Sequence, residues 1–175
     1  GFARHKSFTM VAQAADRATF RLEADDETRA AYPFEFRLDV RFSVTGGALS
    51  IEAELLNPGD VALPASFGFH PALRWPLPGG GARADHRVRF DKDEPAPIRR
   101  IDSAGLLRPR PEPTPVQGRN LPLEDALFVD DALIFDRLAS RALTYGAPGM
   151  PSLRITFPAM PLLGVWTKPG AGFLC

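Results

Sequence analysis

The stretch FEFRLDVRFSV, residues 34–44, alternates apolar and polar side chains over its whole length. Its apolar members are Phe34, Phe36, Leu38, Val40, Phe42 and Val44, with charged or hydroxyl residues between them. Side chains of a β-strand point to opposite faces in turn, so the pattern predicts a strand with one buried and one solvated face. Such a strand is typical of antiparallel sheets, because parallel sheets are covered on both faces.

The same period of two recurs in RATFRLEAD (17–25), LSIEAEL (49–55) and SLRITF (152–157). Turn sequences stand between these segments: TGG (45–47), NPGD (57–60), LPGGG (77–81), APGM (147–150) and KPGAG (168–172). The 18 prolines and 15 glycines leave little room for long helices. Many short strands joined by tight turns predict an all-β fold with antiparallel strands, either a β-sandwich or a barrel.

Two segments depart from the simple pattern. EDALFVDDALIF (124–135) fits one helical turn followed by a strand, and residues 83–123 are weakly periodic and predict a loop with one or two short strands. The length of 175 residues favours one domain spanning 1–175. Both ends lack the polar tail that is usual at chain termini, so we expect the central portion of a longer chain, truncated at both ends.

The composition excludes several classes of partner. Lys and Arg total 21 and so do Asp and Glu, so no net charge favours binding to nucleic acid or to an anionic membrane. No apolar run approaches the roughly 20 residues that a membrane-spanning helix needs. Cys175 is the single cysteine, which excludes an internal disulfide and is typical of a reducing compartment. We therefore expect a cytoplasmic protein.

Polar groups next to aromatic residues are the candidates for a binding site. Glycine-rich phosphate motifs and zinc-binding cysteine spacings are absent from the sequence. The candidates at expected strand ends are Arg4, His70, Arg74, Trp75, Asp130, Asp131 and Trp166. A sugar presents apolar C–H faces that stack on rings and hydroxyls that need hydrogen-bonding partners, so this set indicates a carbohydrate pocket.

Four stretches resemble the aldose 1-epimerase (galactose mutarotase-like) family, in particular its bacterial branch known only as aldose epimerases. They are GFAR (1–4), SFGFHPALRWPL (66–77), DDALIF (130–135) and GVWTKPGAGFLC (164–175), and they follow the family's order. The resemblance implies the family's large antiparallel supersandwich. It also implies interconversion of the α- and β-anomers of a free aldose, such as glucose or galactose, without a cofactor or a metal ion.

The resemblance assigns His70 as the general acid of this reaction. Ring opening needs an acid that protonates the ring oxygen, and a histidine with an ordinary pKa of about 6.5 can give and regain a proton near neutrality. A buried structural histidine is the alternative for His70. His5 and His86 stand among charged residues, and we expect both on the solvated surface.

The remaining site residues also follow from the resemblance. Arg4 matches an arginine that hydrogen-bonds sugar hydroxyls, with a surface ion pair as the alternative. Asp131 matches a carboxylate that holds hydroxyls, although the adjacent Asp130 is easily confused with it and a solvated turn residue is the alternative. Trp166 and Trp75 are expected to be pocket walls, unless they belong to the core.

The sequence also departs from the family pattern. The family's catalytic base is a glutamate in a stretch like FLCIEPW, and the chain stops at Cys175. A histidine that family members carry before GFAR is absent as well. Because losing a general base typically costs about 10²- to 10⁴-fold in rate, we expect the 175 residues by themselves to be impaired.

Three interpretations remain open. The first is an aldose 1-epimerase or a relative acting on phosphorylated sugars, for which Arg74 and Arg83 are available. The second is a non-catalytic carbohydrate-binding or sensing module. The third is an accessory β-sandwich domain of a larger carbohydrate enzyme. The sugar preference and the oligomeric state do not follow from the sequence.

Overall fold

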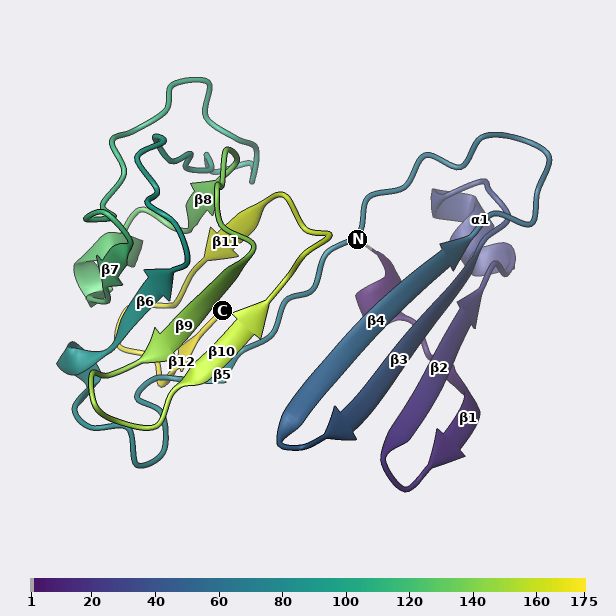
Figure 1. Ribbon diagram of the computed structural model, residues 1–175. Coiled ribbons are helices and arrows are strands. Elements are labelled where there is room, and N and C mark those ends of the chain that lie inside the picture. Colours follow the sequence, from purple (N-terminus) through teal and green to yellow (C-terminus); the bar gives the residue numbers. More distant parts are fainter. Residues whose placement is uncertain (1) are drawn as a thin grey trace. The chain divides into compact units, whose positions relative to one another are not determined.

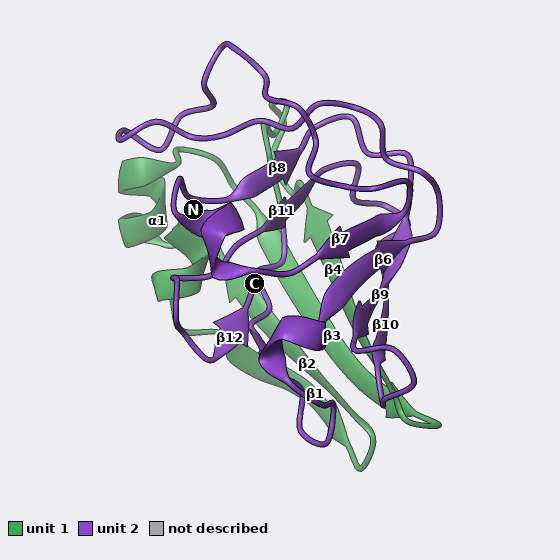
Figure 2. Ribbon diagram, turned by 90° about the vertical axis from the view of Figure 1, so that its left-hand side faces the viewer, with its two compact units in different colours: residues 1–67 green, residues 68–175 purple. Residues whose placement is uncertain are grey.

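The computed structural model describes residues 2–175, so Gly1, the first residue of the GFAR stretch, lies outside the described part. The chain divides into two compact units, with the boundary along the sequence between Phe67 and Gly68 (Figure 2). Most regular elements of the described residues are antiparallel strands, and α1 (Asp26–Ala31) is their one α-helix (Figure 1). The predicted all-β antiparallel class is confirmed. The single domain over residues 1–175 stays a prediction.

The first unit is a meander in which each strand pairs with its neighbour along the chain. Its elements are η1 (Phe2–His5), β1 (Thr9–Ala14), β2 (Arg17–Glu23), α1, β3 (Arg37–Thr45) and β4 (Ala48–Leu56), and its sheet order is β1-β2-β3-β4. Gly46 and Gly47, with φ of 57° and 80°, form the predicted turn between β3 and β4. Leu38 pairs with Leu22 across the sheet, and both belong to a small buried cluster with Phe36.

The structure corrects two details of this unit. Strand β3 begins at Arg37 and not at residue 34, and Val44 and its cross-strand partner Leu49 are 55% and 60% exposed. Both lie next to the turn, beyond the buried cluster. The alternating pattern therefore predicted which face of the sheet these side chains lie on, but not how far the buried core extends along it. The short helix α1 was not predicted either. Its start is a capping box in which the Asp25 carboxylate accepts from Thr28 N–H at 2.6 Å and the Thr28 hydroxyl accepts from Asp25 N–H at 2.8 Å.

The second unit contains shorter strands joined by longer loops (Figure 1). Its elements are β5 (Leu73–Arg74), η2 (Arg83–Asp85), β6 (Arg87–Phe90), β7 (Asn120–Pro122), η3 (Asp125–Phe128), β8 (Leu133–Phe135), β9 (Ala142–Gly146), β10 (Leu153–Thr156), β11 (Leu163–Val165) and β12 (Phe173–Leu174). Strands β10-β9-β6-β7 form one sheet, and β11 pairs with β8 and β12 with β5. The helical turn and strand predicted for residues 124–135 are confirmed, as is the loop with two short strands over residues 83–123.

The core of this unit combines aromatic residues with buried polar groups. Tyr145 is fully buried, its hydroxyl donates to the Arg74 carbonyl at 2.7 Å, and burial raises its pKa to about 12. His86 is only 1% exposed, so its predicted surface position was wrong. Its Nε2 accepts from Leu77 N–H at 3.0 Å and its Nδ1 bonds the Ala82 carbonyl at 2.9 Å, so the loop before η2 closes around the ring. Gly80 permits this approach, because a Cβ there would lie 3.2 Å from Nε2.

Candidate functional site

Two short ladders of the second unit are joined through one pair of residues. Strand β8 pairs with β11, and β5 pairs with β12. Between β11 and β12, the Trp166 N–H donates to the Cys175 carbonyl at 2.9 Å, and the Cys175 N–H donates to the Trp166 carbonyl at 2.7 Å. The strands therefore run side by side in the order β8, β11, β12, β5.

Alternation along these strands separates a buried face from an outer face. The inward side chains Leu133, Val165 and Leu174 belong to the hydrophobic core. The residues that follow or precede them in the chain point the other way, so Arg74, Trp166 and Phe173 share what we call the outer face. Arg74 is exposed, and the half-buried rings of Trp166 and Phe173 lie 5.8 Å apart. An aromatic pair beside an exposed guanidinium can stack on a sugar ring and hydrogen-bond its hydroxyls.

His70 stands in the extended segment that leads into β5, three residues before Leu73, the first residue of that strand. Its imidazole is exposed, and within residues 2–175 it has no hydrogen-bonding side-chain or backbone partner. His70 is therefore not a buried histidine.

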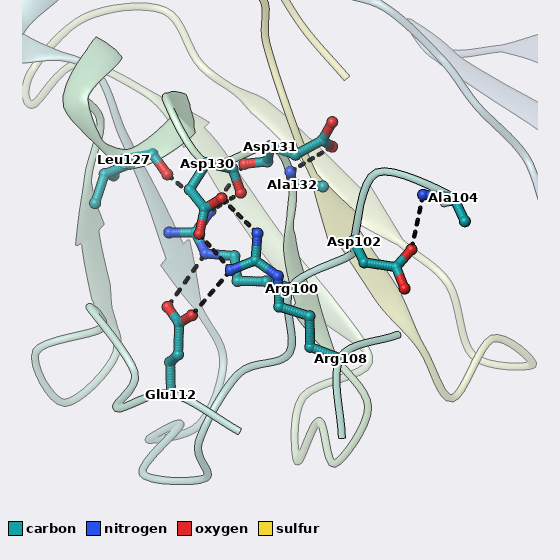
Figure 3. Close-up of polar contacts among 9 residues, drawn as sticks. All are labelled: Arg100, Asp102, Ala104, Arg108, Glu112, Leu127, Asp130, Asp131 and Ala132. Carbon is teal, nitrogen blue, oxygen red and sulfur yellow. Dashed lines mark hydrogen bonds and ion pairs between the residues drawn. The ribbon is translucent and has the colours of Figure 1, made fainter. Parts of the chain in front are cut away.

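The two neighbouring aspartates have different surroundings. Asp130 forms a bidentate pair with Arg108, with both N–O distances at 2.6 Å, and this hydrogen bonding lowers the pKa of the Asp130 carboxyl (Figure 3). The exposed Asp131 carboxylate accepts only from the Ala132 N–H, at 2.6 Å. Asp131 precedes β8, whose first residue pairs with the last residue of β11, so Asp131 and Trp166 lie at the same end of that ladder.

Trp75 belongs to the hydrophobic core of the second unit. The residue is 1% exposed, and its indole Nε1–H donates to the Arg83 carbonyl at 3.0 Å. The Arg83 guanidinium stacks on the ring at 3.5 Å and donates to the carboxylate of Asp125 at 2.7 Å, which lowers the pKa of Asp125. Arg83 is thus occupied by the protein, whereas Arg74 has no ion-pair partner among the described residues.

Arg4 belongs to the first unit. It lies in η1, is exposed, and donates from Nε to His5 Nε2 at 2.9 Å. His5 is exposed as predicted. The structure therefore places Asp131, Trp166 and the strand after His70 on the four neighbouring strands of the second unit, and describes Arg4 within the first.

Beside β5 the surface is hollowed. Arg74, the turn from Trp75 to Gly81 and Gly172 line an open hollow of about 670 Å³, and His70, Asp131 and Trp166 are not among its lining residues. Within residues 2–175 no group of three or more His, Cys, Asp or Glu side chains is arranged to hold a metal ion. None of the helices described is long and apolar enough to cross a membrane.

The family model of aldose 1-epimerase matches residues 1–160 of the chain. The chain belongs to the aldose 1-epimerase family. Among solved structures, a galactose mutarotase-like protein from Lactobacillus casei superposes with a TM-score of 0.87 at 26% identity, covering 99% of this chain and 61% of that one. The galactose mutarotase related enzyme from Lactobacillus acidophilus gives 0.82 at 23% identity, over 100% of this chain and 59% of that one. The predicted mutarotase-like β-sandwich is confirmed.

The chain is also similar to two curated proteins. The plasmid and chromosomal LacX proteins of Lactococcus lactis subsp. lactis are each 29% identical over 172 residues, which cover 95% of this chain and 57% of each relative. The chain therefore spans about three fifths of the length of the relatives that it matches.

Proposed function

We propose that this family member interconverts the α- and β-anomers of a free hexose by acid–base ring opening, with His70 as the general acid. The observation that carries the proposal is the mutual backbone pairing of Trp166 and Cys175, which sets the strand led by His70 beside the aromatic outer face. Exposure of His70 supports its role, because an acid must reach the ring oxygen of a bound sugar.

The chemistry needs two proton transfers. A base removes the proton from O1 while the His70 imidazolium protonates O5, and the bond between C1 and O5 breaks. The open aldehyde turns about the C1–C2 bond, and O5 then attacks the other face of C1. As the ring closes, His70 takes its proton back from O5 and the base returns its proton to O1, so no cofactor is consumed.

The register of β5 and β12 suggests where the base enters. Leu174 pairs with Leu73, and each further step along β12 moves one residue back along β5. If the pairing continues, the second residue after Cys175 comes opposite His70 on the same face. That is the position of the glutamate in the family stretch FLCIEPW, and we propose that this carboxylate is the base.

The other side chains would hold the sugar. We propose that Trp166, backed by Phe173, stacks on its C–H face and that the Asp131 carboxylate binds hydroxyls. The exposed Arg74 leaves a phosphorylated hexose open as a substrate, while the engaged Arg83 contributes nothing to that choice. With one cysteine in the chain, we place the protein in the cytoplasm.

The test is polarimetric mutarotation of freshly dissolved α-D-glucose and α-D-galactose with the protein as its gene encodes it. His70→Asn should lower turnover by about 10²- to 10⁴-fold. The thermal unfolding midpoint should hardly change, because the exposed ring has no partner to lose. Asp93→Asn, an exposed side chain of the β6–β7 connection, is the control and should keep full activity.

A nearly normal rate in His70→Asn would exclude His70 as the acid. Sugar binding by the native protein without acceleration of mutarotation would instead favour a carbohydrate-binding module.

A further inference from the structure

We infer that Arg100 and Arg108 are positioning residues that leave Asp131, and not Asp130, as the carboxylate offered to the sugar. The inference rests on the proposed function in taking Asp131 as a sugar ligand. Both arginines lie in residues 98–112, where the sequence matched no family motif, and neither is expected to contact the substrate.

Arg100 holds the main chain around Asp131. Its Nη1 donates to the carbonyls of Leu127 at 2.9 Å and Asp131 at 2.8 Å, and more weakly to that of Asp130 at 3.4 Å (Figure 3). The Arg100 residue is 8% exposed, so these bonds are made away from solvent. One guanidinium thus ties the end of η3 to the start of β8, because it presents several donors in a rigid plane.

This clamp acts on an unusual backbone conformation. Asp131 has a φ of 63°, in the left-handed region that few residues other than glycine adopt without cost. Aspartate tolerates it better than most residues. The conformation turns the Asp131 carboxylate away from both guanidinium groups, and Asp130 points toward Arg108 (Figure 3). Neighbouring aspartates therefore face different partners.

Arg108 neutralises the second carboxylate. Its two 2.6 Å contacts occupy both oxygens of Asp130, so an unpaired negative charge does not stand next to Asp131. Glu112 links the two arginines, with its oxygens 3.5 Å from Arg100 Nε and 3.6 Å from an Arg108 nitrogen. A sugar hydroxyl then meets one carboxylate in one orientation, as stereospecific binding requires.

The loop that carries these arginines is anchored to the site strand itself. Arg99 and Ile134 of β8 exchange two backbone hydrogen bonds, of 2.8 and 3.1 Å. Ile98 and Glu112 do the same at 2.9 Å each, which closes the base of the loop. A substitution of either arginine should therefore change the conformation of the Asp130–Asp131 turn more than that of other segments.

The experiment compares steady-state mutarotation kinetics and amide hydrogen exchange in six variants of the protein as its gene encodes it. Arg108→Gln should raise KM about 3- to 30-fold with kcat nearly unchanged, because it disturbs binding and not proton transfer. Adding Asp130→Asn to Arg108→Gln should restore most of the lost affinity, because no unpaired carboxylate remains. Asp131→Asn should raise KM by itself, and Arg108→Gln should add little in that background.

Exchange of the Ala132 amide gives a readout that does not depend on activity. This N–H donates to the Asp131 carboxylate at 2.6 Å, so Arg108→Gln and Arg100→Lys should speed its exchange roughly tenfold relative to amides of β10. Arg154→Gln is the matched control, because Arg154 forms an equivalent bidentate pair with Asp91 at 2.6 and 2.8 Å. It should change neither KM nor Ala132 exchange.

The outcomes separate the two ideas. If Asp131→Asn raises KM while Arg108→Gln changes neither KM nor Ala132 exchange, the positioning role is overturned and the proposed function stands. If Asp131→Asn leaves KM unchanged, Asp131 is not the sugar ligand, and both the inference and that part of the proposed function fall.

Discussion

The two units of the chain reach stable structure by different means. In the first, strands of six to nine residues pair with their neighbours in sequence, and a small cluster of Leu22, Phe36 and Leu38 is buried. In the second, strands of two to five residues form the sheet β10-β9-β6-β7 and the pairs β11-β8 and β12-β5, and buried side chains with charges or hydrogen-bonding groups connect the loops.

The difference concerns the distance along the chain over which each contact acts. The hairpins of the first unit need only an alternating pattern and a turn with φ above zero. In the second unit Glu94 accepts hydrogen bonds from the N–H groups of Ala139 and Ser140, at 2.9 and 2.7 Å, across 45 and 46 residues. Hydrogen bonds of this kind, from a buried side chain to distant backbone groups, connect segments whose strands are too short to form long backbone ladders.

The largest effect on stability is expected from the apolar anchor of the first unit. Phe36→Ala should lower the free energy of unfolding by about 3–5 kcal/mol, because a buried ring beside Phe2 and Tyr32 is removed. Val44→Ala, an exposed position on β3, should change it by less than about 0.5 kcal/mol.

The measurement is chemical denaturation followed by circular dichroism and by tryptophan fluorescence. Both tryptophans, Trp75 and Trp166, belong to the second unit, so fluorescence reports that unit. If the two signals shift together in Phe36→Ala, the two units unfold as one. The units would then differ in how they are stabilised but would not have separate stabilities.

A smaller effect is expected at the polar anchor of the second unit. Glu94→Gln should cost about 1–3 kcal/mol, because one of the two buried N–H groups would face the amide NH₂ and lose its acceptor. The adjacent exposed Asp93→Asn is the control and should be nearly neutral. Full stability in Glu94→Gln would show that short strands and apolar packing suffice in this unit. Denaturation followed by fluorescence measures both variants.

The smallest effect concerns an ion pair on the first sheet and depends on pH. Arg21 donates to both oxygens of Asp39, at 2.7 and 2.8 Å, and this hydrogen bonding lowers the pKa of Asp39 below its ordinary 3.8. The carboxylate therefore stabilises the fold fully above pH 3.8, and the contribution disappears as the pH falls through the lowered value.

Asp39→Asn should thus destabilise by no more than about 1 kcal/mol at pH 7 and by less at pH 3. Urea denaturation at both values checks the sign, with Ser43→Ala on the same strand as a control whose effect stays constant with pH. A deficit of Asp39→Asn that grows on acidification would contradict the assignment of the pair.

Sequence patterns predicted local features well in both units. Alternation located β2, β3, β4 and β10, glycine pairs located turns, and the mixed pattern of residues 124–135 predicted a helical turn before a strand. The family motifs located His70, Asp131 and Trp166, whose roles stay predictions. The capping box at Asp25 was a readable signal for α1 that the dominant strand pattern obscured.

Other features had no local signal. Trp75 and His86 are polar-tipped residues in charged, glycine-rich stretches, and each is buried because its ring nitrogens find backbone partners in the η2 region. Asp130 and Asp131 are chemically identical neighbours, and the difference between them depends on Arg108, 22 residues away in the chain. No pattern of short period can encode such a partner.

By itself, the sequence determined the strand class, the faces of the longer strands, the turns and the family, because these depend on neighbouring side chains and on backbone stereochemistry. The tertiary structure alone decided how far each core extends, which rings are buried, and which of two adjacent carboxylates stays free. Those features depend on the desolvation of polar groups and on partners distant along the chain, and both exist only once the chain has folded.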